Sequence, residues 1–138
     1  MKTSPLRTRA FLVALLALLV AGGPAAARDG RRLLVVVDME GIAGVVTDAQ
    51  LGPEGFEYGR FRELMTEEAN AAIAAARQAG ASEFVVVDSH GNFQNLLVDK
   101  LPPDAELVRG GPRPLGMMQG IDASFDGVIF IGYHSSTT

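Results

Sequence analysis

The segment Leu33–Ile42, with the sequence LLVVVDMEGI, constrains the fold of this chain more than any other stretch. Its apolar residues run without alternation into two carboxylates and a glycine, which is typical of a strand buried on both faces of a parallel sheet. Ligands of open α/β sheets bind outside the carboxyl ends of the strands. Asp38 and Glu40 are two residues apart, so an extended chain places them on the same side. Two like charges at this spacing need a cation between them, and the segment predicts a metal site.

The N-terminal residues have the layout of a secretory signal peptide. Lys2, Arg7 and Arg9 carry positive charge ahead of the apolar run Ala10–Ala21, and the small residues Ala25–Ala27 follow a Gly-Gly-Pro break. The apolar run is too short for a membrane-spanning helix. We therefore predict that residues 1–27 are a cleaved signal peptide and that the protein is exported, to the periplasm or the medium. The alternative is an uncleaved N-terminal anchor.

Residues 28–138 are then the predicted mature chain, which is long enough for one domain with its own core. The full sequence has a formal charge of −4, and removal of the signal peptide takes away basic residues but no acidic ones. This balance does not suit nucleic acid or an anionic membrane surface as a partner. The sequence has no cysteine, so the prediction of export rests on the signal peptide alone.

Hydrophobic periodicity along the mature chain predicts a right-handed βαβ unit. A glycine-rich loop, Gly41–Gly55, follows the first strand, and a segment of that length is usually functional. Apolar residues then recur at three- and four-residue steps over Phe56–Ala79, the pattern of a helix with one buried face. Thr66 is a candidate cap for a second helical piece. Phe84–Asp88 is the second buried strand, a near copy of the first.

Several shorter elements follow in the second half of the chain. We expect a short helix within Asn92–Lys100, a strand at Ala105–Arg109, a short helix beginning at Pro114 with Met117 and Met118 in the core, and a buried strand at Gly127–Gly132. The predicted fold is α/β, with a mostly parallel sheet flanked by helices in three α/β/α layers.

Side chains of the metal-binding type follow three of the predicted buried strands. Asp38 and Glu40 follow the first, Asp88 and His90 the second, and His134 the last, and the chain has only these two histidines. In a parallel sheet these strand ends share one edge. Carboxylate and imidazole are ligands of Zn²⁺ or Mn²⁺, and a carboxylate can bridge two ions that together bind water and a carbonyl or phosphoryl oxygen. The pattern predicts metal-assisted hydrolysis.

Each of these residues also has a structural interpretation when it is taken alone. Asp38 or Asp88 can accept hydrogen bonds from loop N–H groups, and a histidine at a strand end is often a hydrogen-bonded core residue. Glu67 and Glu68 fit the positive end of a helix, with a weaker interpretation as support for a metal site. The joint placement of the polar residues, rather than any one of them, favours the metal site.

Four segments carry a resemblance to a known family: Val37–Ile42, Met65–Asn70, Asp88–His90 and Gly132–His134. In order and spacing they are similar to motifs of the D-aminopeptidase family of dinuclear zinc metallopeptidases, the M55 peptidases. The resemblance covers about Leu33 to His134. It implies an α/β fold, a homo-oligomer, and hydrolysis that releases N-terminal D-amino acids from short peptides.

The resemblance also implies roles for four residues. Asp38 corresponds to the aspartate that bridges two zinc ions, Glu40 and His90 to ligands of one ion, and His134 to a ligand of the other. The family's remaining glutamate ligand and its catalytic histidine lie downstream of the Gly-Tyr-His motif, so we expect no catalytic residue within this chain. The chain corresponds to the N-terminal half of such an enzyme. We therefore expect a truncated fold, an incomplete second zinc site and weak activity for this polypeptide alone.

Two other functions remain open from the sequence. A Mg²⁺-dependent phosphatase of the haloacid dehalogenase type also begins with Asp-x-acid-Gly after a first strand, but it needs an aspartate in place of Glu40. It also needs a lysine at a later strand end, and the only lysine of the mature chain is Lys100, in a predicted loop. The other alternative is a non-catalytic exported domain that binds metal or peptide.

Overall fold

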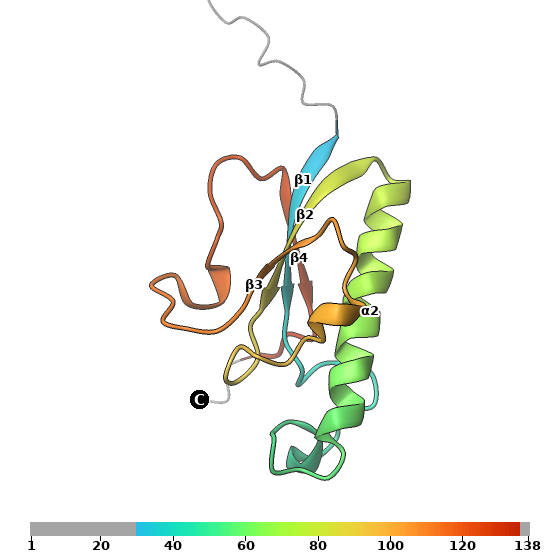
Figure 1. The fold of residues 1–138 in the computed structure, drawn as a ribbon, viewed down its shortest axis with the longest axis vertical. Helices are drawn as coiled ribbons and strands as arrows, with labels where there is room; N and C mark the ends of the chain where they lie inside the picture. The colour runs from blue at the N-terminus through green and yellow to red at the C-terminus, as the bar shows by residue number, and fades with distance from the viewer. Residues whose placement is uncertain (1–29, 136–138) are drawn as a thin grey trace, which may run out of the picture.

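A four-stranded parallel sheet forms the centre of this computed structural model, which describes residues 30–135 (Figure 1). The predicted signal peptide lies outside the described residues. The order of strands across the sheet is β3-β2-β1-β4. The elements are β1 (Arg31–Val37), η1 (Asp48–Gln50), α2 (Tyr58–Gln78), β2 (Ala81–Asp88), η2 (Val98–Lys100), β3 (Glu106–Val108), η3 (Gly116–Met118) and β4 (Gly127–Ile131).

Strand β1 lies inside the sheet, as its apolar sequence predicts. It pairs with β2 on one side and β4 on the other, so that Val35 lies opposite Val86 and Ile129. The side chains from Leu34 to Val37 are fully buried. Both faces of β1 and β2 are covered, which is why these strands have β-branched residues at consecutive positions instead of an alternating pattern.

Helix α2 covers one face of the sheet (Figure 1). Its apolar stripe, formed by Phe61, Met65, Ala69 and Ile73, packs on the strands. The helix runs without interruption, so the predicted second helical piece at Thr66 is wrong. The Thr66 hydroxyl donates to the carbonyl of Arg62 in the preceding turn, which lets a threonine lie inside a helix instead of capping one.

The opposite face of the sheet is covered by the connection between β3 and β4. Met118, Ile121 and Phe125 pack against the second layer of buried side chains from β1 and β2. Within residues 30–135 the short helix predicted after Pro114 is the 3-10 helix η3, and the short helix predicted within Asn92–Lys100 is the 3-10 helix η2. Met117 points outward with 43% of its surface exposed, so its predicted core position is wrong.

Strand β4 is at the edge of the sheet in the described part of the chain. It pairs with β1 alone, and Phe130 is 53% exposed. The prediction of a strand at this position is correct, but the prediction that it is buried on both faces is wrong, because the apolar sequence does not specify how many neighbours a strand has. The predicted α/β fold with a parallel sheet is confirmed. No helix within residues 30–135 is long and apolar enough to cross a membrane.

A backbone contact between two glycines joins the end of β1 to the end of β4. The Asp38 N–H donates to the carbonyl of Ile131, and the Gly41 N–H donates to that of Gly132, each at 2.8 Å. Gly132 has a φ of +69°, and a Cβ there would lie 2.0 Å from the Asp38 carbonyl oxygen. Only glycine fits this position, and the contact fixes the chain after Val37 against the chain after Ile131.

We expect Gly132→Ala to lower the free energy of unfolding by about 3 kcal/mol, because the methyl group meets the Asp38 carbonyl and the backbone is strained. Urea denaturation followed by circular dichroism measures this loss. Gly52→Ala is the matched control, since a Cβ at Gly52 meets nothing within 4 Å, and its change should stay within about 0.5 kcal/mol. Equal stability of the two variants would contradict the proposed contact.

Candidate metal centre

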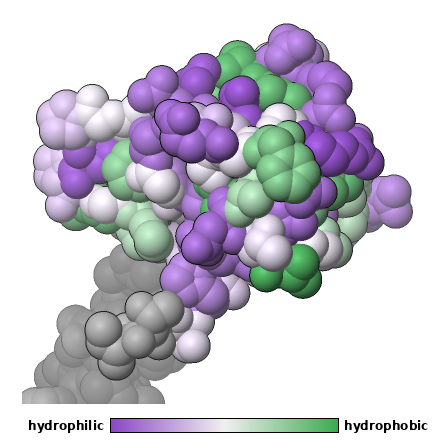
Figure 2. Space-filling view, turned by 90° about the horizontal axis from the view of Figure 1, so that it is seen from below, coloured by the Kyte–Doolittle hydropathy of each residue, from purple (hydrophilic) through white to green (hydrophobic). Residues whose placement is uncertain are grey.

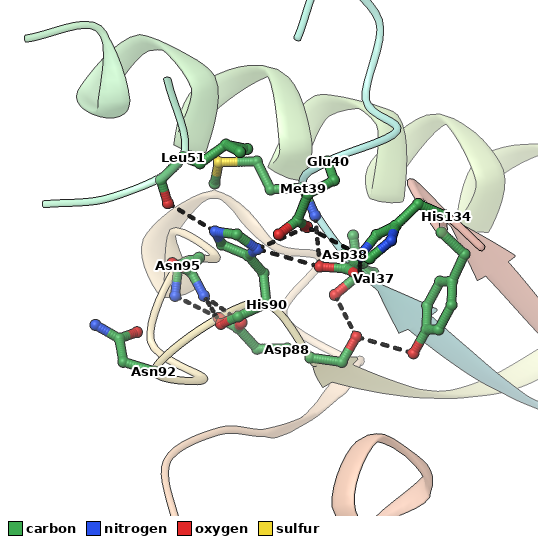
Figure 3. Close-up of polar contacts among 12 residues, drawn as sticks. Val37, Asp38, Met39, Glu40, Leu51, Asp88, His90, Asn92, Asn95 and His134 are labelled. Carbon is green, nitrogen blue, oxygen red and sulfur yellow. Dashed lines mark hydrogen bonds and ion pairs between the residues drawn. The ribbon is translucent and has the colours of Figure 1, made fainter. Parts of the chain in front are cut away.

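The four predicted metal ligands come together at the carboxyl ends of the strands (Figure 3). Asp38 and Glu40 follow β1, His90 follows β2 and His134 follows β4. Ligand atoms of Asp38, Glu40 and His134 all lie within 4.8 Å of one another. His90 Nδ1 lies 3.2 Å from Asp38 Oδ1 and 2.9 Å from Glu40 Oε2. The sequence prediction that these residues converge is therefore correct.

His90 is held at both ring nitrogens. Its Nε2 lies 2.7 Å from the carbonyl oxygen of Leu51, in the loop between β1 and α2. A carbonyl only accepts, so Nε2 carries the hydrogen and Nδ1 faces the two carboxylates. Burial alone lowers the pKa of His90, but the hydrogen bonds to Asp38 and Leu51 and the charge of Glu40 outweigh it and raise the pKa to about 9. The protonated Nδ1 of His90 therefore places a positive charge beside the carboxylates of Asp38 and Glu40.

His134 shows the same arrangement with the nitrogens exchanged. Its Nδ1 lies 2.8 Å from the Ser135 carbonyl oxygen and therefore carries the hydrogen. Its Nε2 faces the carboxylates, at 3.7 Å from Asp38 Oδ2 and 4.0 Å from Glu40 Oε2. A histidine that donates one ring N–H to a carbonyl and directs its other nitrogen at carboxylates has the geometry of a metal ligand.

Asp38 lies between the two histidines. Its Oδ1 is on the side of His90 and also accepts from the Met39 N–H at 2.9 Å, whereas its Oδ2 is on the side of His134. Burial raises the pKa of Asp38, but the hydrogen bonds, first of all that with His90, outweigh it and hold the pKa below the ordinary value of 3.8. Asp38 is therefore an ionised, buried carboxylate with one oxygen directed toward each histidine.

The centre is closed on one side and open on the other. The His90 side chain is 6% exposed, while those of Glu40 and His134 are 33% and 45% exposed. Seen from the end of the molecule that carries the carboxyl ends of the strands, the surface is mainly hydrophilic with separate hydrophobic side chains (Figure 2). Among the described residues, the side of the centre formed by Glu40 and His134 is therefore the one exposed to solvent.

Asp88 supports the loop after β2 and does not face the other carboxylates. It is fully buried and accepts from the N–H groups of Asn95 and Leu96, at 2.5 and 2.7 Å. The sequence left open whether Asp88 binds a metal or accepts hydrogen bonds from a loop. The structure shows that it accepts hydrogen bonds from the loop. Its neighbour Ser89 donates to the Val37 carbonyl at 2.7 Å and lies 3.0 Å from the Tyr133 hydroxyl, so one serine connects the ends of β1, β2 and β4.

Glu67 and Glu68 were predicted near the positive end of a helix, and this prediction is wrong because α2 begins at Tyr58. Both residues lie in the middle of the helix. Glu68 accepts a hydrogen bond from the Ala43 N–H at 2.9 Å and so supports the loop that follows Glu40. Its contribution to the centre is indirect and acts through the backbone.

Sequence reasoning missed Arg113, whose guanidinium joins the loops after β2 and β3. It donates to the carbonyls of Gly110 at 2.6 Å, Asp88 at 2.7 Å and Val108 at 3.1 Å, and its Cζ lies 4.2 Å from the centre of the Phe93 ring. No local pattern reveals this role, because all three acceptors are backbone oxygens that any residue supplies.

The donor set fits a zinc ion. Zinc takes imidazole nitrogen and carboxylate oxygen at about 2.0–2.2 Å, so two of its ligands lie at most about 4 Å apart. The separations of 2.9–4.0 Å between the histidine nitrogens and the carboxylate oxygens meet this condition. The hydrogen bonds to Leu51 and Ser135 direct the opposite nitrogen of each ring at the carboxylates, where it can bind an ion in place of a proton. The fold and the site together define an α/β protein with a candidate metal-binding centre at its strand ends.

Comparison with known proteins gives relatives of the same kind, one of which is described as a Zn-dependent enzyme. The profile of the M55 peptidases, described as D-aminopeptidase, matches residues 32–138. A D-aminopeptidase of Bacillus subtilis strain 168 is 44% identical over 104 residues, covering 75% of this chain and 38% of that protein. The solved structure of the Zn-dependent D-aminopeptidase DppA from Bacillus subtilis, described as a self-compartmentalizing protease, superposes with a TM-score of 0.74 and 44% identity over 78% of this chain and 39% of that one.

The chain belongs to the M55 D-aminopeptidase family. It spans about two fifths of the length of the relative that it matches. The resemblance found in the four sequence segments is therefore confirmed. The match gives no support to the phosphatase or to the non-catalytic binding domain as alternatives.

We expect Arg113→Lys to lower the free energy of unfolding by about 1–3 kcal/mol, because an ammonium cannot reach the three carbonyls that the planar guanidinium joins. Arg109→Lys is the matched control, since Arg109 is exposed, and its change should stay within about 0.5 kcal/mol. Urea denaturation of both variants makes the comparison, and an Arg113→Lys protein as stable as the control would contradict the bridging role.

Proposed function

We propose that this chain binds zinc through Asp38, Glu40, His90 and His134 and contributes to the release of N-terminal D-amino acids from short peptides. The observation that carries the proposal is the position of Asp38, which directs one carboxylate oxygen toward each of the two histidines. A carboxylate in this position can be shared by two ions, one on each side. When bound, zinc would polarise a peptide carbonyl and lower the pKa of a water molecule for attack on it.

The residues of the chain have separate roles in this proposal. His90 and Asp38 form the closed side of the centre, where burial excludes water and strengthens their electrostatic interactions. Glu40 and His134 line the open side, from which a peptide approaches. The substrate of an aminopeptidase carries a positive α-ammonium group, and the partly exposed carboxylate of Glu40 is suited to attract it.

The specificity for D-amino acids is proposed from the relatives. Both are D-aminopeptidases, and the solved one is Zn-dependent. Because this chain spans about two fifths of their length, we propose that its activity needs the further part of the M55 domain, and that residues 30–135 supply the zinc ligands and the closed side of the centre.

Assembly and location are proposed on separate grounds. The solved relative is described as self-compartmentalizing, and on that basis we propose that this chain forms homo-oligomers. The layout of residues 1–27 is the basis for proposing export to the periplasm or the medium. An exported member of the family would meet D-amino-acid peptides released in cell-wall turnover.

We expect zinc to raise the stability of the folded chain, because the ion binds a preformed site that the unfolded chain lacks. At a free zinc concentration 100 times the dissociation constant, the folded state gains about 2.7 kcal/mol. Differential scanning calorimetry of chelator-treated protein, with and without added zinc, measures the shift in Tm.

A test variant and a matched control each change one aspartate to asparagine. Asp38→Asn removes the shared negative charge and should abolish the zinc-dependent shift in Tm, whereas Asp99→Asn, in the exposed part of η2, should retain it. A shift in Tm that survives in Asp38→Asn would place the zinc elsewhere and contradict the proposed centre.

We expect zinc-dependent cleavage of D-alanine p-nitroanilide, and no cleavage of the L-isomer, when the chain is mixed with the remaining part of an M55 domain, and at most weak cleavage by the chain alone. The rate should fall at least about 100-fold in Asp38→Asn, because the shared carboxylate holds the reacting centre together. Release of p-nitroaniline is followed by absorbance, first for this chain and then for the chain mixed with the remaining part of an M55 domain. Cleavage of p-nitrophenyl phosphate with Mg²⁺, in place of the anilide with Zn²⁺, would contradict the peptidase.

A further inference from the structure

We infer that Asn95 is a positioning residue for the metal centre: its buried side-chain amide fixes the backbone of His90 and thereby directs His90 Nδ1 at the two carboxylates. This inference rests on the proposed function, since it concerns the same centre. Asn95 touches neither Asp38 nor Glu40 in the described structure, and it acts through the peptide group of His90 (Figure 3).

The amide of Asn95 lies at the centre of a buried network. Its Nδ2 donates to the His90 carbonyl at 2.5 Å and to Asp88 Oδ1 at 2.9 Å, and its Oδ1 accepts from the Tyr58 hydroxyl at 2.5 Å. The residue is 2% exposed. Both amide hydrogens and the amide oxygen are therefore used inside the protein, where an unpaired polar group would be costly.

The backbone of Asn95 is fixed as well. Its N–H donates to Asp88 Oδ2 at 2.5 Å, and its carbonyl accepts from Arg62 Nε at 2.7 Å. Asp88 is the last residue of β2, and Tyr58 and Arg62 are in the first turns of α2. The network therefore ties the loop that carries His90 to both the sheet and the helix, which are the rigid parts of the fold.

The loop needs such a restraint because its backbone is strained. Gly91 has a φ of +50°, and Phe93 has a φ of +62°, in the left-handed region that a residue with a large side chain rarely adopts. The His90 carbonyl also accepts from the Phe93 N–H at 2.9 Å, so Asn95 and the strained turn act on the same oxygen. Loss of the amide would release the peptide that sets the direction of the His90 side chain.

The orientation of the His90 ring then depends on two fixed points. The backbone is held by Asn95, and the far nitrogen of the ring is held by the Leu51 carbonyl. With both in place, Nδ1 has no freedom to turn away from Asp38 and Glu40. A residue that orients a metal-ligating histidine typically changes metal affinity by about 10–100-fold when it is removed.

The first experiment compares Asn95→Ala with Asn92→Ala. Asn92 has the same side chain and lies in the same loop, but it is exposed and its amide oxygen accepts only locally, from the Gln94 N–H. Zinc affinity is measured by competition with a chromogenic chelator. We expect Asn95→Ala to bind zinc at least about tenfold more weakly than wild type and Asn92→Ala to bind within about twofold. Equal affinities of the two folded variants would overturn the inference.

The second experiment reports on His90 without zinc, so that failure of this inference is distinguishable from failure of the proposed function. The sequence has only two histidines, and imidazole ¹⁵N NMR of His134→Gln assigns the signals of His90. We expect the Nε2 hydrogen of His90 to be hydrogen-bonded to the Leu51 carbonyl and slow to exchange with water in wild type and Asn92→Ala, and to exchange faster in Asn95→Ala. A wild-type chain that binds no zinc contradicts the proposed function, while unchanged His90 signals in Asn95→Ala overturn the positioning role.

Tyr58→Phe provides a milder test in case Asn95→Ala does not fold. It removes only the hydroxyl that donates to Asn95 Oδ1, and this hydroxyl does not contact His90 directly. We expect zinc affinity to fall by about threefold to tenfold, with the same far-UV circular dichroism as wild type. Unchanged affinity and unchanged His90 signals in a folded Tyr58→Phe protein overturn the inference.

Discussion

The placement of the Asp38 and Glu40 carboxylates beside one histidine nitrogen is the constraint on which the centre depends. Two carboxylates at the end of one strand are tolerated because the Nδ1 of His90 lies within 3.2 Å of both. The Nε2 of His134 faces them from the other side. The pKa of His90 is raised to about 9 by this contact, after burial is overcome, and that of Asp38 is held down. The same arrangement that needs a positive charge is the one that suits a zinc ion.

The backbone holds these charges in place by joining strand ends that are far apart in sequence. Gly41 and Gly132 bring the chains after β1 and β4 into direct contact, and Ser89 connects β1, β2 and β4 through one hydroxyl. Arg113 does the same for the loops after β2 and β3. None of these residues faces the ligand atoms, and each affects the centre by limiting how far one strand end can move relative to the next.

The sequence predicted the elements well where one physical rule dominated. The unbroken apolar runs identified β1, β2 and β4, and the helical stripe from Phe61 to Ile73 identified α2. Prediction failed where contacts with residues distant in sequence, or the position of a segment in the fold, determined the local structure or the exposure of a side chain. Thr66 can cap a helix or bond within one, and Met117 lies on a connection whose outward face no periodicity specifies. The exposure of Phe130 follows from the position of β4 at the edge of the sheet within residues 30–135, which its sequence does not encode.

By itself the sequence determined which side chains could hold a metal, because Asp38, Glu40, His90 and His134 each follow an apolar strand and parallel strands end at a common edge. The four motifs also determined the family. Only the tertiary structure decided how these residues are used. It separated Asp88, which anchors a loop, from Asp38, which lies between the histidines, and it showed which nitrogen of each imidazole faces the carboxylates. These outcomes depend on hydrogen bonds to backbone carbonyls and amides, which are present at nearly every residue and therefore leave no trace in the sequence.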